Sequence, residues 1–256
     1  MQKEHSARIH LKIRDGIVLI GSDGHYWPGR ASTAHRAFVH FARRLGPSAI
    51  IFNGDALDGA SISRHPPIGW ETRPSVAEEI AVCQERLQEI QDASPCSSRI
   101  WTRGNHCVRY ETRLASAIPE FSGVKGLRLA DQFPSWEFCW SVWLNGSVVV
   151  KHRNKGGTHA AHNNAVVSGM TMVTGHTHQL KVAGVPDYRG TRWGVECGCL
   201  ADIYAKAFEN YTEDNPRLWQ SGFALLTFVD GRLLQPELVR VHDKNHVDFR
   251  GELIKI

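Results

Sequence analysis

The chain has 256 residues, of which 42% are hydrophobic and 22% charged, as expected for a globular protein that buries a sizeable core. Its net charge of +4 is compatible with an anionic ligand but too small to indicate an extended surface for a polyanion. No apolar stretch approaches the ~20 residues of a transmembrane helix, and the first residues lack the apolar core of a secretory signal. We therefore expect one domain spanning residues 1–256, located in the cytoplasm and not in a membrane.

The first half of the chain alternates short apolar runs with helical patterns. Buried strands are predicted at residues 17–20, 49–52 and 99–102, and each run ends in glycine and polar residues. Helices are predicted at 32–45 and 75–90, the second beginning with a capping box formed by Ser75 and Glu78. This succession predicts a largely parallel sheet with helices on its faces.

The second half is richer in strands. From residue 126 to 143 the pattern is weak, and we interpret the three tryptophans of this stretch as packing residues. Strands are predicted at 148–150 and 170–174, with a helix at 158–167 between them. Further on, the runs 223–229 and 232–241 flank Asp230-Gly231, a strong hairpin turn signal. We expect two β layers.

Fourteen histidines and six cysteines are present. The cysteines have no paired CxxC spacing, which argues against a zinc ribbon and favours free thiols. Several histidines instead lie with aspartates in the loops that follow the predicted strands. These loops contain Asp23 and His25, Asp55 and Asp58, Asn105 and His106, His152, and His176 and His178.

Loops at the carboxyl ends of neighbouring strands form the ligand sites of α/β sheets, so these residues can meet in space. One Asp-x-His triplet is usually a surface turn or a helix cap. Five groups of the same chemistry, in order, are hard to explain as turns. Carboxylate, amide oxygen and imidazole without thiolate suit Mn²⁺, Fe or Zn²⁺, and the ligands are numerous enough for two ions that share a carboxylate.

Together these motifs resemble those of the calcineurin-like metallophosphoesterases. They extend from Asp23 to His178 and read Asp23-Gly24-His25, Gly54-Asp55-Ala56-Leu57-Asp58, Gly104-Asn105-His106, His152 alone, and Gly175-His176-Thr177-His178. A softer resemblance to phage and prophage members lies in Gly198-Cys199-Leu200 and in the run from Trp219 to Phe223.

The resemblance implies an α/β fold, a four-layer α/β/β/α sandwich with a dinuclear metal site at the strand ends. It also implies two divalent ions, Mn²⁺ first, with Fe, Zn²⁺ or Ni²⁺ as alternatives. The implied ligands are Asp23, His25 and His178 for the first ion, Asn105, His152 and His176 for the second, and Asp55 as a bridge.

By the same resemblance, His106 would act beside the substrate and Asp58 would orient it. The implied reaction is hydrolysis of a phosphodiester, or of a monoester, by a hydroxide that bridges the ions. Two other functions are compatible with these motifs: a DNA or RNA nuclease, and a catalytically inactive interaction scaffold. The complete set of ligands and the intact His106 argue against the scaffold.

Two positions depart from the family pattern. Cys107 stands where the family usually has an acid, which leaves open its effect on rate and metal preference. Arg153 follows His152 where glycine is frequent, and with Lys151 and Lys155 it forms a basic strip. This strip either contacts the phosphate of the substrate, which makes Arg153 a candidate substrate-binding residue, or is a solvated loop.

Overall fold

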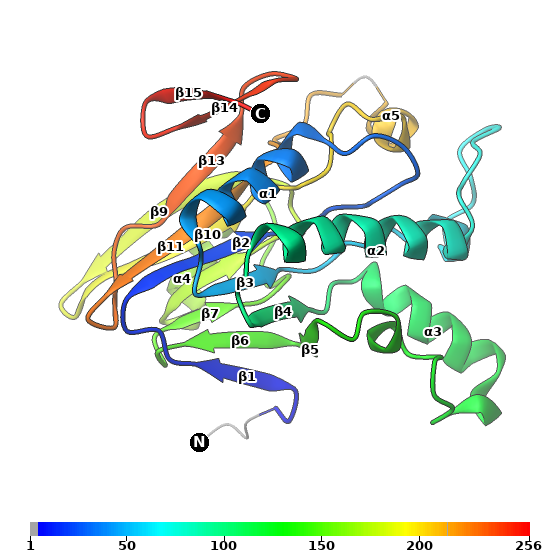
Figure 1. Cartoon of the computed structure of the whole chain (residues 1–256), viewed down its shortest axis with the longest axis horizontal. Coiled ribbons are helices and arrows are strands. Elements are labelled where there is room, and N and C mark those ends of the chain that lie inside the picture. Colours follow the sequence, from blue (N-terminus) through cyan, green and yellow to red (C-terminus); the bar gives the residue numbers. More distant parts are fainter. Residues whose placement is uncertain (1–4, 214) are drawn as a thin grey trace.

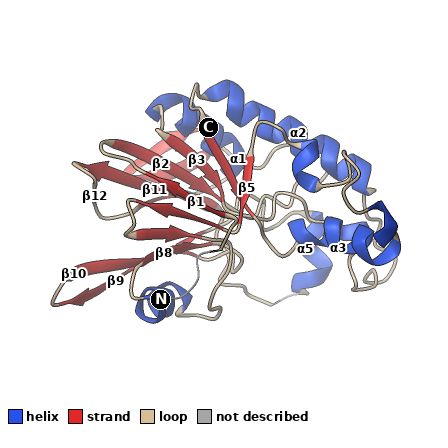
Figure 2. Cartoon of the chain, turned by 90° about the horizontal axis from the view of Figure 1, so that it is seen from below, coloured by secondary structure: helices blue, strands red, loops and turns tan. Residues whose placement is uncertain are grey.

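A computed structural model of the chain describes residues 5–213 and 215–256. Two β-sheets face each other, and helices cover their outer sides (Figures 1 and 2). The larger sheet is ordered β15-β14-β13-β11-β2-β3-β4-β5, with β12 paired to β11, and the smaller is ordered β1-β6-β7-β8-β10-β9. The expected four-layer α/β/β/α sandwich is confirmed.

The larger sheet contains a parallel half and an antiparallel half. Its parallel strands are β2 (Gly16–Gly21), β3 (Ala49–Phe52), β4 (Ser98–Thr102) and β5 (Glu137–Cys139). Its antiparallel strands are β11 (Gly222–Val229), β12 (Arg232–Leu233), β13 (Glu237–Val241), β14 (His246–Phe249) and β15 (Glu252–Lys255).

The smaller sheet is formed by β1 (Arg8–Leu11), β6 (Ser141–Leu144), β7 (Val148–Val150), β8 (Thr171–Thr174), β9 (Leu180–Asp187) and β10 (Gly190–Cys197). The helices are α1 (Thr33–Leu45), α2 (Val76–Ala93), α3 (Cys107–Ala117), α4 (Ala160–Ser168) and α5 (Lys206–Thr212). In the described residues, no helix is long and apolar enough to cross a membrane.

Two cores hold the layers together, and the alternation of side chains in β2 shows how. Leu19 points into the core beneath α1 and α2, whereas Val18 and Ile20 point into the core between the two sheets. The outer face of the smaller sheet is covered by α4, which packs on β8, β9 and β10. All six cysteines are buried free thiols, as predicted.

The predicted elements are confirmed with small shifts of their ends, and the capping box of Ser75 and Glu78 is present. The hairpin at Asp230-Gly231 forms, but its second arm is divided between β12 and β13. The break contains Pro236, which has no N–H for a β ladder. Helix α3, in which Cys107 is the only buried residue, is not predicted from the sequence.

The parallel strands place the motifs. β2, β3 and β4 of the larger sheet and β7 and β8 of the smaller sheet all end at the same edge of the sandwich (Figure 1). The buried side chain of Asn53, just after β3, ties these ends together. It donates to the carbonyl of Lys151 after β7 (3.2 Å) and accepts from the Thr102 hydroxyl of β4 (2.7 Å). The motif loops of both sheets therefore face one site.

Candidate metal centre

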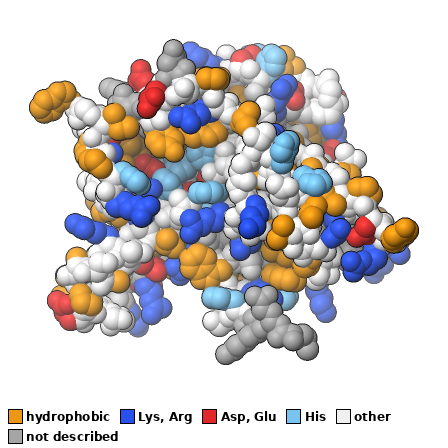
Figure 3. Space-filling model, turned by 180° about the vertical axis from the view of Figure 1, so that it is seen from behind, with side chains coloured by type: hydrophobic (Ala, Val, Ile, Leu, Met, Phe, Trp, Pro, Cys, Tyr) orange, Lys and Arg blue, Asp and Glu red, His pale blue; other side chains and the backbone are white. Residues whose placement is uncertain are grey.

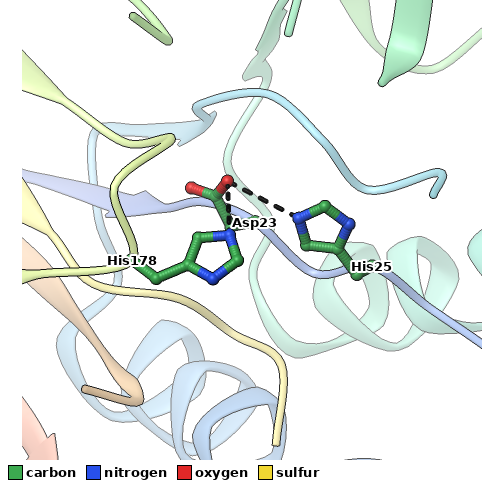
Figure 4. A group of neighbouring side chains, drawn as sticks. All are labelled: Asp23, His25 and His178. Atoms are coloured by element: carbon green, nitrogen blue, oxygen red, sulfur yellow. Dashed lines mark ion pairs between the residues drawn. The ribbon is translucent and has the colours of Figure 1, made fainter. Parts of the chain in front are cut away.

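Asp23, His25 and His178 form the first group of facing side chains (Figure 4). All three are buried, and their ligand atoms lie within 4.8 Å of one another. Asp23 Oδ1 lies 3.2 Å from His178 Nε2 and 3.7 Å from His25 Nε2. The other oxygen, Oδ2, accepts from the Ser22 hydroxyl and from the His176 backbone N–H (2.9 Å). Asp23 is thus held through one oxygen while the other faces two imidazoles.

Asp55, His152 and His176 form a second group with the same spacing. Asp55 Oδ2 lies 2.9 Å from His152 Nε2, and the Asn105 side-chain oxygen lies 3.2 Å from the same nitrogen. The other ring nitrogen of His152, Nδ1, lies 2.8 Å from the carbonyl of Asn53. That carbonyl accepts the Nδ1 proton, so once the ring loses its other proton the lone pair is on Nε2, which can then act as a ligand.

Asp55 also lies near the first group, because Asp55, His25 and His106 have ligand atoms within 4.8 Å of one another. Its Oδ1 accepts the backbone N–H groups of His106 (2.9 Å) and Cys107 (3.2 Å). The loop after β4 can approach this closely because it has glycine at position 104. A Cβ on Gly104 would lie 2.0 Å from Asp55 Oδ1.

His106 lies half-buried beside both groups, and Asp58 holds it. Asp58 Oδ1 lies 2.8 Å from His106 Nδ1 and 3.0 Å from His25 Nδ1, so one carboxylate oxygen faces two histidines. Asp58 Oδ2 accepts from the Trp27 indole N–H (3.3 Å). The sequence-based interpretation paired Asp58 with His106 alone, and the contact to His25 is an additional one.

Glu79 of α2 holds the loop that carries Asp58 through hydrogen bonds to its backbone. This buried carboxylate accepts the backbone N–H groups of Gly59 (2.6 Å) and Ala60 (3.0 Å), the two residues that follow Asp58. Burial raises the pKa of Glu79 to about 7, with the nearby Asp58 adding to the shift and the backbone N–H groups opposing it. Sequence reasoning missed Glu79 because it resembles any other glutamate in the first turn of a capped helix.

The electrostatic potential of the centre favours positive charge. Burial alone would lower the pKa of His25, but the neighbouring carboxylates of Asp23 and Asp58 raise it to about 10. Burial also opposes a charge on His152, yet Asp55 and Asp23 raise its pKa to about 9. A proton on either ring would compete with a cation, so metal binding must release protons.

The residues fit a divalent cation. Asp23 Oδ1, His25 Nε2 and His178 Nδ1 are buried and make no hydrogen bond, although such atoms are nearly always paired in folded proteins. Within the described residues, the ion-pair partners of Asp23 and Asp55 are all histidines. Buried carboxylates, with imidazoles that lose their extra proton on binding, are the donor set of Mn²⁺, Fe and Zn²⁺ sites.

Cys107 supports the centre as a neutral group. Its sulfur lies 3.1 Å from the backbone N–H of Asp55 and accepts from it. Burial, reinforced by the negative charge of Asp55, raises the pKa of the Cys107 thiol to about 12. The side chain therefore remains protonated near neutral pH and adds no negative charge to the centre.

The basic residues near the site do not form one track. Arg153 is exposed and close enough to His176 to lower that residue's pKa, after the larger effect of burial. Arg103 pairs with Glu111 (3.0 Å). Arg109 instead reaches the centre: its guanidinium donates to the Asp58 carbonyl (3.0 Å) and lies 3.3 Å from His106 Nε2. Sequence reasoning could not identify this contact, because it depends on α3.

The chain is similar to one curated relative. It is 32% identical over 235 residues to the "Gene 54 protein" of Mycobacterium phage L5, which covers 80% of this chain and 86% of that protein. No family model matches the chain.

Similar solved structures are more distant. A single-residue mutant of Vps29 from Entamoeba histolytica has a TM-score of 0.48 at 15% identity, covering 94% of this chain and 99% of that one. A protein serine/threonine phosphatase from Saccharomyces cerevisiae has a TM-score of 0.41 at 12% identity, covering 98% and 84%. The phosphoesterase YfcE from E. coli has a TM-score of 0.36 at 16% identity, covering 86% and 97%.

Asp55 is the ligand whose loss should weaken metal binding most, because it lies between the two groups. We expect Mn²⁺ to raise the melting temperature of the wild-type chain, since a ligand that binds the folded state stabilises it. In Asp55→Asn this increase should largely disappear, and the bound metal measured by mass spectrometry should fall. Arg153→Gln, a change just outside the ligand set, serves as the control. An Asp55→Asn protein with undiminished metal content would contradict the assignment.

Proposed function

We propose that this protein is a calcineurin-like metallophosphoesterase that hydrolyses phosphate esters. The chain belongs to the same family as the Gene 54 protein of Mycobacterium phage L5, and its motif residues form groups that can hold metal ions. One observation carries the proposal. Asp55 belongs to one group of ligand atoms and lies next to the other. The imidazole of His106, which neither set of proposed ligands needs, lies beside both groups and is paired with the carboxylate of Asp58. A site for metal storage or a structural metal has no use for such a group.

We infer that the centre holds two divalent cations. Asp23, His25 and His178 would bind the first and Asn105, His152 and His176 the second, with Asp55 between them. Two such cations would stabilise the attacking and leaving oxygens and lower the pKa of water from about 15.7 towards 7. The oxygen and imidazole donors suit Mn²⁺ first, with Fe, Zn²⁺ or Ni²⁺ as alternatives.

In this proposal His106 serves the leaving group. Asp58 accepts the Nδ1 proton and so fixes the orientation of the ring, which leaves Nε2 to face the substrate. Nε2 would donate a hydrogen bond, and then a proton, to the departing alkoxide oxygen. Asp58 acts through His106 and His25 and is a positioning residue.

Arg109 would contact the phosphate. A guanidinium has only donors, so in the structure it must face the lone pair of His106 Nε2. That arrangement is incompatible with Nε2 as a proton donor unless an acceptor lies between the two side chains. A phosphate oxygen is such an acceptor and could receive hydrogen bonds from both.

The distribution of charge supports a small ester as the substrate. A nuclease that follows a long backbone needs a broad basic face. Here Arg103 is neutralised by Glu111 and Arg109 is engaged with His106 and Asp58, which leaves Lys151, Arg153 and Lys155 as a short strip. We therefore place phosphodiesters of small alcohols first, with monoesters next.

Chromogenic mono- and diesters should be hydrolysed in the presence of Mn²⁺, and excess chelator should abolish the activity. Turnover should depend weakly on salt, because few phosphates are contacted. Long DNA and RNA, assayed under the same conditions, should be cut slowly. A KM for an oligonucleotide far below that for a small diester, and rising steeply with salt, would establish the nuclease function instead. Full activity in chelator would reject the metal-dependent mechanism.

His106→Asn should lower kcat by roughly 10²–10⁴ while leaving the metal content unchanged, because the side chain donates a proton and is not a ligand. The loss should be smaller for esters with good leaving groups, which need no proton. Asp58→Asn should lower kcat less, and with the same dependence on the leaving group. Loss of metal from His106→Asn would show that His106 is a ligand.

Arg109→Gln should lower kcat/KM by roughly tenfold or more, because a hydrogen bond between two charged groups is removed. Arg113→Gln is the matched control, since Arg113 is an exposed residue one turn further along α3. Kinetics of both variants on one small diester make the comparison. Equal values for the two variants would mean that Arg109 only supports the loop of Asp58.

A further inference from the structure

Aromatic side chains from the segment between β10 and β11 lie against the metal-ligating histidines. The ring of Phe208, on α5, lies 5.7 Å from the ring of His25 and 6.0 Å from that of His178. Trp219, just before β11, lies 4.6 Å from the ring of His178 and 5.5 Å from Phe208. Phe208 and Trp219 therefore form one wall of the metal centre.

The wall continues outwards to solvent. Tyr211 stacks on Trp219, with ring centroids 6.0 Å apart and planes inclined by 12°, and 62% of Tyr211 is exposed. The guanidinium carbon of Arg217 lies 5.8 Å from the centre of the Tyr211 ring and 5.9 Å from that of Trp219. In Figure 3, hydrophobic side chains and Lys or Arg side chains border the hollow in which histidines gather.

Packing alone does not explain this arrangement. A ring that only supports a core is buried, as Phe38 and Trp101 are here, whereas the outer ring of this wall is mostly exposed. Stacked aromatic rings beside an arginine are the surface on which single nucleotides bind, since every base offers a flat π face and the arginine adds a positive charge.

We propose that Tyr211 and Trp219 form a platform that stacks on a nucleobase, so that the substrates of this centre are nucleotide esters whose phosphate lies at the metals. The proposal rests on the function proposed above and specifies the alcohol of the ester as a nucleoside. It does not require a long polynucleotide, because one base and one phosphate occupy the platform and the centre.

Binding measurements can isolate the contribution of the base. Thymidine 5′-monophosphate and 2-deoxyribose 5-phosphate carry the same phosphate, and the sugar phosphate has an anomeric hydroxyl in place of the base. Both are titrated calorimetrically into the Mn²⁺-loaded His106→Asn chain, in which turnover is slow. The nucleotide should bind roughly 5- to 150-fold more tightly, the range found when a stacking ring is removed from other proteins.

Tyr211→Ala, made in the same background, should bring this ratio close to one without changing the affinity for the sugar phosphate. Tyr211 is the suitable position because it is not the ring that packs on His178. That ring is Trp219, and its removal could disturb a proposed metal ligand. Tyr188→Ala is the control, since Tyr188 is a fully exposed tyrosine at the turn between β9 and β10. Trp219→Phe, which keeps a ring beside His178, should reduce the ratio only in part.

The outcomes separate this proposal from that of hydrolysis. A ratio near one in the parent, or a ratio unchanged by Tyr211→Ala, overturns the platform even if the wild-type chain hydrolyses esters. A ratio lost in Tyr211→Ala but retained in Tyr188→Ala supports the platform, even if the wild-type chain hydrolyses none of the esters tested.

Discussion

One carboxylate, that of Asp55, joins the parts of the molecule that form the site. It follows β3, accepts two backbone N–H groups at the start of α3, and faces His152 of the smaller sheet. The N–H groups and His152 come from two different segments, one from each sheet, so both sheets must be packed before the carboxylate is satisfied. A buried aspartate without them would be costly, and this links the formation of the site to the completion of the fold.

The backbone at the site is held in conformations that side chains rarely adopt. Nine non-glycine residues in the described chain have positive φ, and five of them are proposed ligands: Asp23, His25, Asp55, His176 and His178. Each such residue costs about 1–3 kcal/mol and persists only where its surroundings fix it. Here the fixing contacts are those of Asn53, Ser22 and Gly104 with their neighbours. The ligands are therefore oriented before any cation arrives.

The sequence predicted what depends on local patterns. Buried strands are short apolar runs that end in glycine and aspartate, so β2, β3 and β4 and their motif loops could be located from residue types alone. In α3 Cys107 alone is buried, and none of the described side chains of α5 is buried, so neither helix has the run of buried apolar residues that marks α1. The contacts of Arg109, Glu79 and Tyr211 depend on how these helices and α2 pack, and their sequence neighbours give no signal of that.

Substrate specificity cannot come from the motif residues alone. The motif residues provide carboxylates and imidazoles that would hold cations and a phosphate of any ester equally, so they cannot select an alcohol. Selection requires contacts that differ between substrates. In the proposals above, two elements outside the motifs would supply such contacts, Arg109 on α3 and the rings of Tyr211 and Trp219 at and near α5. On these proposals, a change in these elements would alter the substrate and leave the proposed chemistry at Asp55 unchanged.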